Sequence, residues 1–270
     1  ISNCISGRDA TKGSCCDDDV TGCGEGFTCS SDNTCFRIDS ADYSLPERIP
    51  RYRLCTVAKS DLQVHGFSMT KDDDSSQKVA YLSTAGSLDT LNSKGIETAW
   101  IVIHGSLRDP DDYICCASTT LELQGISNST LVIAPWFLAP QDRVQDGEYL
   151  RWEEKGPIPY TWRYGENAIN SNASSYAVVD QLIEALITLP DLKRIVVAGH
   201  SAGGQYVQRW AMLSQQSALE VVPIRIVVAN PKSFCYLDDR RMLNGTLCKP
   251  HADDIHTCPS YNEWQWGLDN

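Results

Sequence analysis

The chain has 270 residues, of which 42% are hydrophobic and 21% charged, and this balance predicts one substantial globular domain plus a small one. The formal net charge of -12 leaves no basic face for phosphate groups, which argues against nucleic acid and against electrostatic docking on anionic membranes. No apolar run approaches the roughly 18 residues that a membrane-spanning helix needs, so we expect no transmembrane segment.

Residues 1–36 are rich in cysteine and show no hydrophobic period of either helix or strand. Because they hold too few large apolar residues for a core, we predict a small module stapled by disulfides. The stretch CCDDDVTGCGEGFTCSSDNTC loosely resembles granulin-like or knottin-like modules, although its adjacent cysteine pair comes second and third in the order. Zinc binding is the alternative, but no histidine lies nearby. The six cysteines are Cys4, Cys15, Cys16, Cys23, Cys29 and Cys35.

Cysteine usage and glycosylation motifs predict a secreted protein. The total of twelve cysteines is even, which favours disulfides in an oxidising compartment. Three Asn-x-Ser/Thr sequons predict glycosylation at Asn128, Asn172 and Asn244. The first residue is Ile1 and no signal-like apolar segment is present, so we expect a processed mature chain.

The next part of the chain begins an alternation of strands and helices. Residues 37–50 are predicted to be a linker, and residues 51–58 and 78–83 to be strands. Residues 98–103 form a buried apolar run, followed by a helix that starts near residue 109. This helix carries adjacent Cys115 and Cys116, which point in different directions and are expected to pair elsewhere rather than with each other.

The pattern continues with a strand over residues 129–135, an amphipathic helix over 174–189, and apolar strands at 195–198 and 223–229. This order predicts a doubly wound, mostly parallel α/β sheet with right-handed crossovers. Between these elements, residues 141–167 form a long insertion with five aromatic residues. These aromatics either line a substrate-side wall or lid, or pin the insertion to the domain. They are Tyr149, Trp152, Tyr160, Trp162 and Tyr164.

The sequence Gly199-His200-Ser201-Ala202-Gly203 lies between an apolar strand and an amphipathic helix. A serine attacks a carbonyl only when it stands clear of the sheet and a base takes its proton. A tight strand-to-helix turn exposes the hydroxyl, and the flanking glycines remove side chains that would collide there. The N–H of Ala202, at the helix N-terminus, would point at a developing oxyanion.

On this motif the chain resembles the α/β-hydrolases, in particular secreted serine esterases and lipases, from about residue 51 to the end. By that resemblance, the His104-Gly105-Ser106 sequence begins the oxyanion loop, and the Ser106 N–H is the second oxyanion donor. His104 would then orient this loop as a structural histidine. The resemblance implies a single α/β-hydrolase domain over residues 51–270.

The resemblance also implies an acid and a histidine base after the nucleophile, but about 40 residues follow the last predicted strand, and they read as loops. Related secreted and fungal hydrolase-like proteins continue into further strands that carry both groups. One interpretation is that the domain is incomplete at its C-terminus and a second polypeptide completes the triad. The other is a compact, cutinase-like enzyme that uses His256, in a loop clamped by Cys248 and Cys258, or else His251, with Asp238 or Asp239 as the acid.

The resulting hypothesis is a secreted serine hydrolase that cleaves carboxylic esters through an acyl-enzyme on Ser201. No metal or organic cofactor is expected, because no ligand cluster or phosphate-binding glycine loop occurs in the sequence. The alternative hypothesis is a catalytically inactive α/β-hydrolase domain that serves as a binding or adhesion module.

Overall fold

The structure is a computed structural model in which the chain divides into two compact units, considered separately below. The sheet unit comprises Arg51–Phe234, and the terminal unit comprises Ile1–Pro50 with Cys235–Asn270. Of the predicted domain boundaries, residue 36 lies within strand β2 (Cys35–Arg37), and residue 50 lies outside the described residues. The structure describes residues 27–29, 35–37, 62–69, 77–91, 94–144, 148–153, 161–214, 221–231, 233–243 and 246–269.

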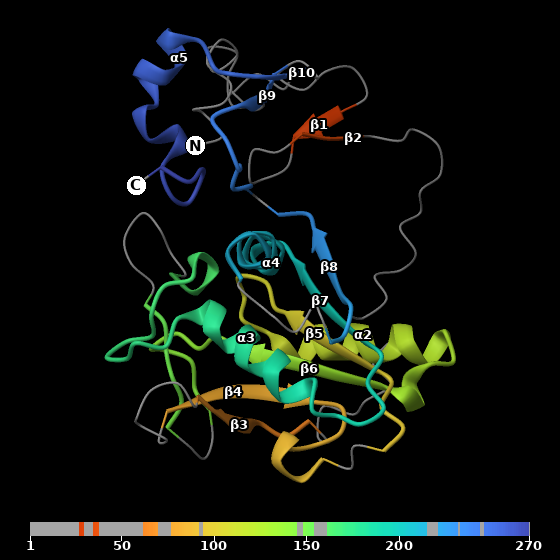
Figure 1. The fold of residues 1–270 in the computed structure, drawn as a ribbon. Helices are drawn as coiled ribbons and strands as arrows, with labels where there is room; N and C mark the ends of the chain where they lie inside the picture. The colour runs from red at the N-terminus through yellow and green to blue at the C-terminus, as the bar shows by residue number, and fades with distance from the viewer. Residues whose placement is uncertain are drawn as a thin grey trace. The chain divides into compact units, whose positions relative to one another are not determined.

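The sheet unit is built on six strands in the order β3-β4-β6-β5-β7-β8 (Figure 1). The last four strands in this order run parallel, whereas β3 and β4 pair antiparallel to their neighbours. The prediction of a mostly parallel sheet is therefore confirmed, and the strand predicted at 51–58 lies outside the described residues. The strands are β3 (His65–Ser68), β4 (Lys78–Ser83), β5 (Thr98–Ile103), β6 (Thr130–Trp136), β7 (Arg194–His200) and β8 (Ile224–Ala229).

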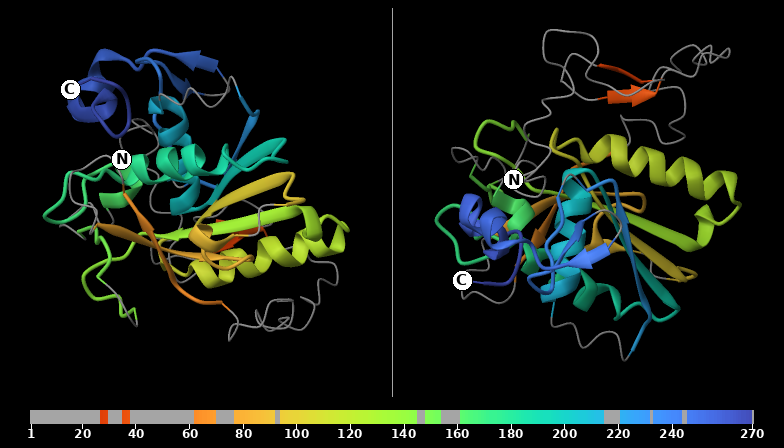
Figure 2. Two further views of the ribbon diagram at one scale, coloured as in Figure 1. Left: turned by 60° about the horizontal axis from the view of Figure 1, so that its bottom comes forward. Right: turned by 90° about the horizontal axis from the view of Figure 1, so that it is seen from above.

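Three helices form the crossovers between the parallel strands: α2 (Pro110–Leu123), α3 (Ser175–Leu186) and α4 (Ala202–Leu213). Helix α2 covers one face of the sheet, and α3 and α4 cover the other (Figure 2). Side chains of successive strand residues point to opposite faces, and six consecutive residues of β6 are buried, so both faces of this central strand are covered. In the described residues, no helix combines the length and the apolar character needed to cross a membrane.

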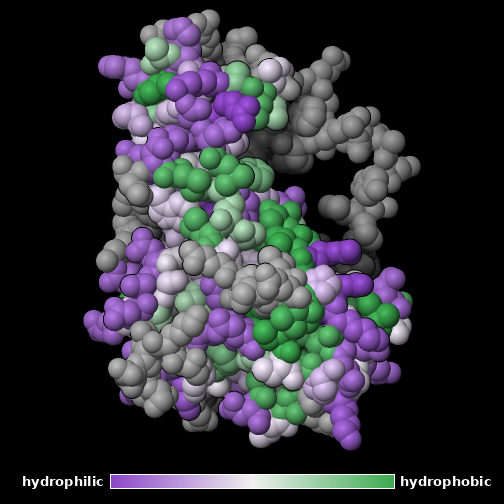
Figure 3. Space-filling model, viewed as in Figure 1, coloured by the Kyte–Doolittle hydropathy of each residue, from purple (hydrophilic) through white to green (hydrophobic). Residues whose placement is uncertain are grey.

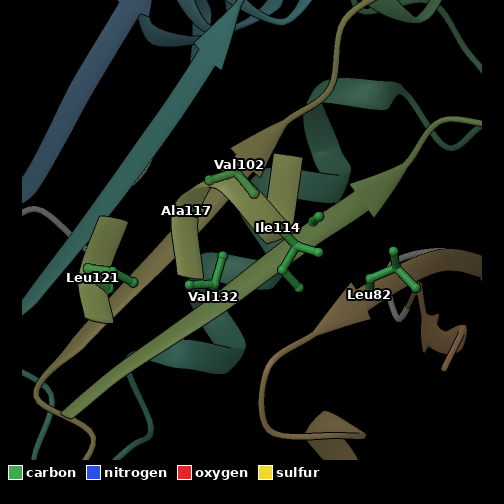
Figure 4. Packing of buried hydrophobic residues seen from close by; sticks show 7 residues of the cluster. Leu82, Val102, Ile114, Ala117, Leu121 and Val132 are labelled. Atoms are coloured by element: carbon green, nitrogen blue, oxygen red, sulfur yellow. The ribbon is translucent and has the colours of Figure 1, made fainter. Parts of the chain in front are cut away.

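The core under α2 shows how the sequence pattern produces this packing (Figure 4). Residues Ile114, Ala117 and Leu121 lie at helical spacing on α2 and pack against Val102 of β5 and Val132 of β6. Each fully buried aliphatic side chain of this size contributes about 1.5–3 kcal/mol through removal of apolar surface from water. Leu82 and Ala134 complete the cluster.

Strand β8 is parallel as predicted, but it is the outer strand of the described sheet and is partly exposed, although α4 contacts it. Three consecutive residues, Ile226, Val227 and Val228, are 38%, 41% and 36% exposed, so both faces of the strand reach solvent. Hydrophobic side chains are visible in Figure 3 in the region where Figure 1 places β8. This exposure is unusual for a parallel strand, which is normally covered on both faces.

The terminal unit contains two short antiparallel hairpins, and one of them corrects a prediction. Strands β1 (Phe27–Cys29) and β2 (Cys35–Arg37) place Cys29 opposite Cys35. Residues expected to be loops form the second hairpin, β9 (Arg241–Leu243) and β10 (Thr246–Cys248), followed by α5 (Ala252–Thr257) and η7 (Pro259–Asn262). Three-residue strands are too short to show a hydrophobic period, which is why the sequence pattern missed them.

The hairpin β9–β10 is held by Arg241, whose side chain is buried. Its guanidinium donates to the carbonyl of Tyr261 at 2.7 Å and to the Asn262 side chain at 2.9 Å, and it lies over the Tyr236 ring at 4.2 Å. A buried charge requires such hydrogen bonds because it has lost its water. The segment has no apolar periodicity, and the contacts of the Arg241 side chain connect the hairpin to the residues that follow it.

Candidate active site

Ser201 sits in a strained turn between β7 and α4. Its backbone has φ 57° and ψ -118°, a conformation that residues other than glycine rarely adopt. Its N–H donates to the carbonyl of Ala229 at 3.0 Å, and its own carbonyl accepts from the N–H of Gln205 at 3.0 Å. These bonds fix the turn between β8 and the first turn of α4. The strand–turn–helix context predicted for Gly199–Gly203 is therefore confirmed.

Two glycines around Ser201 lie against the backbone of neighbouring segments. A Cβ atom on Gly199 would lie 2.2 Å from the carbonyl oxygen of Gly203, and one on Gly204 would lie 2.5 Å from that of Ala229. Contacts this short with a backbone atom are not tolerated by any side chain. The glycines thus allow the helix to start directly at the end of the strand.

The two predicted oxyanion donors, Ser106 and Ala202, follow adjacent strands. Ile103 pairs with Gly199 in the parallel register of β5 and β7, so both donors leave the same edge of the sheet. Within the described residues, neither the Ser106 N–H nor the Ala202 N–H has a hydrogen-bond acceptor. Ser201 itself is half-buried. Two N–H groups without acceptors near a serine hydroxyl are the kind of donors that a tetrahedral acyl-transfer intermediate requires.

His104 is fully buried at the end of β5, and its ring contacts fix its role. Its Nε2 accepts from the N–H of Phe137 at 3.0 Å, so the proton lies on Nδ1, which donates to the carbonyl of Gly105 at 2.9 Å. Burial lowers the pKa of His104 from 6.5 to about 4, which keeps the ring neutral. The prediction of a structural histidine that orients the loop is confirmed.

The loop after His104 also contacts Tyr113 of α2. The Tyr113 hydroxyl hydrogen-bonds the backbone of Gly105, and a Cβ atom on Gly105 would lie only 2.7 Å from that oxygen. Burial is the main cause that raises the pKa of Tyr113 to about 12. The hydroxyl therefore stays protonated and holds the loop as a neutral group.

The aromatic residues of the insertion serve mainly to pin it. Trp152 and Trp162 are each 1% exposed, and the Trp162 ring stacks on Phe137 at 5.1 Å and packs against His104 at 4.7 Å. The ring of Tyr206, on α4, contacts the rings of both Phe137 and Trp162. A substrate wall made of Trp152 and Trp162 is therefore wrong, because neither side chain reaches solvent. Tyr160 lies outside the described residues.

No residue in the described part of the chain hydrogen-bonds the hydroxyl of Ser201. Besides buried His104, the sheet unit holds His65, whose ring packs on Tyr81, and His200, whose Nε2 lies 3.3 Å from the amide nitrogen of Asn230. These three histidines are occupied elsewhere. In the described part of the sheet unit, no histidine is therefore a hydrogen-bond partner of Ser201, the predicted nucleophile.

The candidate base and acid belong to the terminal unit. His256 lies in α5 and, like His251, is exposed. Asp238 is paired with Arg240 at 2.6 Å, and this hydrogen bond lowers the pKa of its carboxyl group. Asp239 forms an ion pair with Lys249.

The cysteines in the described residues correct two expectations. Cys258 is disulfide-bonded and Cys248 is not, so the predicted clamp between these two residues is wrong. Cys115 and Cys116 do not pair with each other, as predicted, but Cys116 keeps an exposed thiol instead of pairing elsewhere. Only Cys115 of this adjacent pair is buried, which follows from the helical rotation between successive residues.

Two of the predicted glycosylation sites are exposed on the sheet unit. Asn128 lies in the short helix η4 (Ser127–Ser129), and Asn172 precedes α3. Asn244 lies outside the described residues. No group of three or more histidine, cysteine or acidic residues that could hold a metal ion occurs among the residues described.

The sheet order and the strained serine turn together define the α/β-hydrolase fold. No protein-family model and no curated protein sequence matches the chain. Solved structures with a similar fold include a poly(3-hydroxybutyrate) depolymerase from Bordetella parapertussis, at 18% identity, with 72% of this chain and 60% of that chain covered and a TM-score of 0.41.

Two further similar structures are a brefeldin A esterase and an arylesterase. Their identities are 14% and 15%, and their TM-scores are 0.37 and 0.36. The match covers 64% of this chain and 40% of the first structure, and 65% of this chain and 47% of the second. The chain thus spans at most 60% of the length of these three proteins.

Proposed function

We propose that this protein is a serine hydrolase that cleaves carboxylic esters through an acyl-enzyme on Ser201. The observation that carries the proposal is the strained Ser201 backbone, at φ 57° and ψ -118°, beside two N–H groups without acceptors in the described residues. Strain of this kind costs about 1–3 kcal/mol and persists where the surrounding structure enforces it. A role for Ser201 as the nucleophile, with these N–H groups as oxyanion donors, would explain why the fold maintains this turn.

In the proposed reaction, the Ser201 hydroxyl attacks the ester carbonyl as a base takes its proton. The N–H groups of Ser106 and Ala202 donate to the oxyanion of the tetrahedral intermediate. The intermediate collapses by releasing the alcohol, which receives the proton from the base, and leaves the acyl group on Ser201. Water then attacks this acyl-enzyme by the same route and releases the carboxylic acid.

The base and the acid are the open part of the mechanism. We propose either His256 or His251 with Asp238 from the terminal unit, or a second polypeptide that supplies both groups. His104 is excluded as the base, because its ring is fully buried and both nitrogens are hydrogen-bonded.

We further propose that the protein passes through the secretory pathway and acts outside the cell. The cysteine count, the disulfide-bonded Cys115 and Cys258, and the exposed sequons at Asn128 and Asn172 support this localisation. The same support applies to the proposed disulfide staples of residues 1–36.

A second function is favoured by one observation, the absence of any hydrogen-bond partner for the Ser201 hydroxyl within the described residues. A chain without a base would be a catalytically inactive hydrolase domain that binds a partner. Function resides in the site and not in the fold, so the two alternatives require an experiment.

Labelling of the full chain with a fluorophosphonate, followed by peptide mapping, tests the proposal. Stoichiometric modification of Ser201, abolished in Ser201→Ala but not in Ser233→Ala, would support the enzyme. The variants His256→Ala and His251→Ala would then identify the base by loss of labelling. A folded chain that is neither labelled nor active on p-nitrophenyl esters contradicts the self-contained enzyme.

A further inference from the structure

The loop that carries Ser106 is tied to the segment after β6 by one ion pair of low exposure. The Nε of Arg108 donates to Oδ2 of Asp142 at 2.6 Å, and its Nη2 donates to Oδ1 at 3.1 Å. The two side chains are only 9% and 17% exposed. A bidentate guanidinium–carboxylate pair of this kind fixes both distance and orientation.

Arg108 also holds the backbone around Ser106 directly. Its N–H donates to the carbonyl of Gly105 at 3.2 Å, and its Nη1 donates to the carbonyl of Ser106 at 3.4 Å. The backbone of Arg108 has φ 55°, the left-handed region in which an arginine is uncommon. The residue is therefore held in this conformation by its contacts.

The geometry of the peptide group links these contacts to the oxyanion donor. The Gly105 carbonyl and the Ser106 N–H belong to the same planar, trans peptide group, so they point in opposite directions. The carbonyl accepts from His104 Nδ1 at 2.9 Å and from the Arg108 N–H. Holding the carbonyl on one side therefore aims the Ser106 N–H to the other side.

Asp142 is in turn anchored on its own segment. Its Oδ2 accepts from the N–H of Ala139 at 2.7 Å. The Nη1 of Arg151 donates to the carbonyls of Ala139 and Asp142 at 2.7 and 2.8 Å. The anchor follows β6, which pairs with β5 in the sheet, so it gives the loop after β5 a fixed support from its neighbouring strand.

We propose that Asp142 and Arg108 are positioning residues that set the orientation of the Ser106 N–H toward the oxyanion. This inference rests on the proposed function, because it assigns the ion pair a role in transferring the acyl group to Ser201 and then from Ser201 to water. Neither residue takes part in bond making or breaking. Their effect is transmitted through the Gly105–Ser106 peptide group.

The test compares three variants of the full chain. Asp142→Asn removes the charge and keeps the shape, whereas Arg108→Lys keeps the charge and loses the fork. Glu97→Gln is the control, because Glu97 forms an ion pair of the same 2.6 Å length with Lys193 at the opposite, amino-terminal edge of the sheet. Hydrolysis of p-nitrophenyl butyrate and amide hydrogen exchange of the peptide over residues 103–109 are measured for each.

We expect kcat to fall about tenfold or more in Asp142→Asn with KM within about twofold, since loss of an oxyanion donor costs 10²–10³ in kcat and the donor here is misaimed rather than removed. The kcat of Arg108→Lys should fall less than that of Asp142→Asn, because the lysine ammonium can still donate one hydrogen bond to Asp142. Exchange over residues 103–109 should accelerate in both variants and stay at the wild-type rate in Glu97→Gln. Arg108→Lys also serves if Asp142→Asn does not fold.

Wild-type kcat in Asp142→Asn and Arg108→Lys, or an effect on KM alone, overturns the positioning role. A wild-type chain that neither hydrolyses the ester nor labels at Ser201 overturns the proposed function itself. In that case the hydrogen exchange still decides whether the ion pair orders the loop. If the wild-type chain is active, faster exchange with unchanged kcat in the variants would mean that the ion pair orders the loop but has no positioning role in catalysis.

Discussion

A Cβ atom on Gly203 would lie 2.2 Å from the carbonyl oxygen of Ile103 and 2.7 Å from that of His104. Helix α4 therefore starts in direct contact with the end of β5, where the loop that carries Ser106 begins. This contact places the turn at Ser201 against the loop that carries Ser106, without a side chain on Gly203 between them.

Replacing this glycine tests the contact. We expect Gly203→Ala to destabilise the protein by about 1–3 kcal/mol or more through overpacking, and to abolish fluorophosphonate labelling of Ser201. Urea denaturation and labelling measure the two effects. The control is Gly125→Ala, where φ is +69° and no atom lies within 4 Å of the added Cβ. It should lose about 1–2 kcal/mol from backbone strain alone and keep its labelling.

The Ser106 side chain should be dispensable, because the proposed donor is its backbone N–H. We expect Ser106→Ala to retain kcat and KM for p-nitrophenyl butyrate within about twofold, in contrast to the loss expected in Asp142→Asn. Steady-state kinetics on both variants provide the comparison. A large loss of kcat in Ser106→Ala would show that the hydroxyl itself takes part.

His104 should make the fold sensitive to mild acid. Its pKa in the folded state is lowered to about 4, whereas the unfolded chain titrates near 6.5. Above pH 6.5 both states are neutral and no penalty arises. As the pH falls from 6.5 toward 4, only the unfolded state takes up the proton, so the free energy of unfolding should fall by up to about 3 kcal/mol.

Urea denaturation at several pH values checks this dependence. His104→Gln should be less stable at pH 7 but should show a flatter profile between pH 6.5 and 4. Leu123→Ala, at an exposed side chain that does not titrate, is the control and should keep the wild-type slope. Equal slopes in His104→Gln and the wild type would refute the assignment.

Trp162 is predicted to stabilise the fold rather than to bind substrate. Because its ring is 1% exposed and stacks on Phe137, we expect Trp162→Ala to cost about 3–5 kcal/mol. Leu123→Ala, at a side chain that is 79% exposed, should change stability by less than about 0.5 kcal/mol. Thermal and urea unfolding measure both. A stable Trp162→Ala with a raised KM would restore the substrate-wall interpretation.

Glycosylation can be checked by expression through a eukaryotic secretory pathway. Asn128→Gln and Asn172→Gln should each remove one glycan, because both asparagines are exposed. Mass spectrometry before and after enzymatic deglycosylation gives the count. A wild-type chain that is secreted without any glycan would contradict the assignment of these sequons.

The fold was largely predictable from the sequence because each parallel strand is a short apolar run. Such a run can be identified in the sequence without knowing which strand it pairs with. The runs at 98–103 and 195–198 lie at the centre of the sheet. The apolar residues at helical spacing on α3 are buried: Val178, Val179, Leu182, Ile183 and Leu186. The turn at Ser201 was also predictable from local sequence. Its glycines approach neighbouring backbone atoms so closely that only glycine, which has no Cβ, fits there. The parallel strands and the turn at Ser201 could therefore both be predicted from local sequence.

The features that the sequence did not reveal depend on contacts between distant residues. Arg108 and Asp142 are separated by 34 positions, and nothing in the sequence marks either as a partner of the other. The same holds for Arg241, which lies in β9 and donates hydrogen bonds to Tyr261 and Asn262, 20 and 21 positions away. The aromatics of the insertion were ambiguous because aromatic residues serve both in cores and at binding sites.

The order of the strands in the sheet differs from their order in the chain, so some strands are synthesised well before the neighbours with which they pair. Strand β5 lies between β6 and β7, and Glu97 and Lys193, which flank β5 and β7, are 96 residues apart. At about 5–20 residues per second, a ribosome needs roughly 5–20 s to deliver β7 after β5 has emerged. During that interval the edge of β5 that pairs with β7 has no partner strand, so the nascent chain presents an open strand edge to aggregation until β7 and then β8 join the sheet.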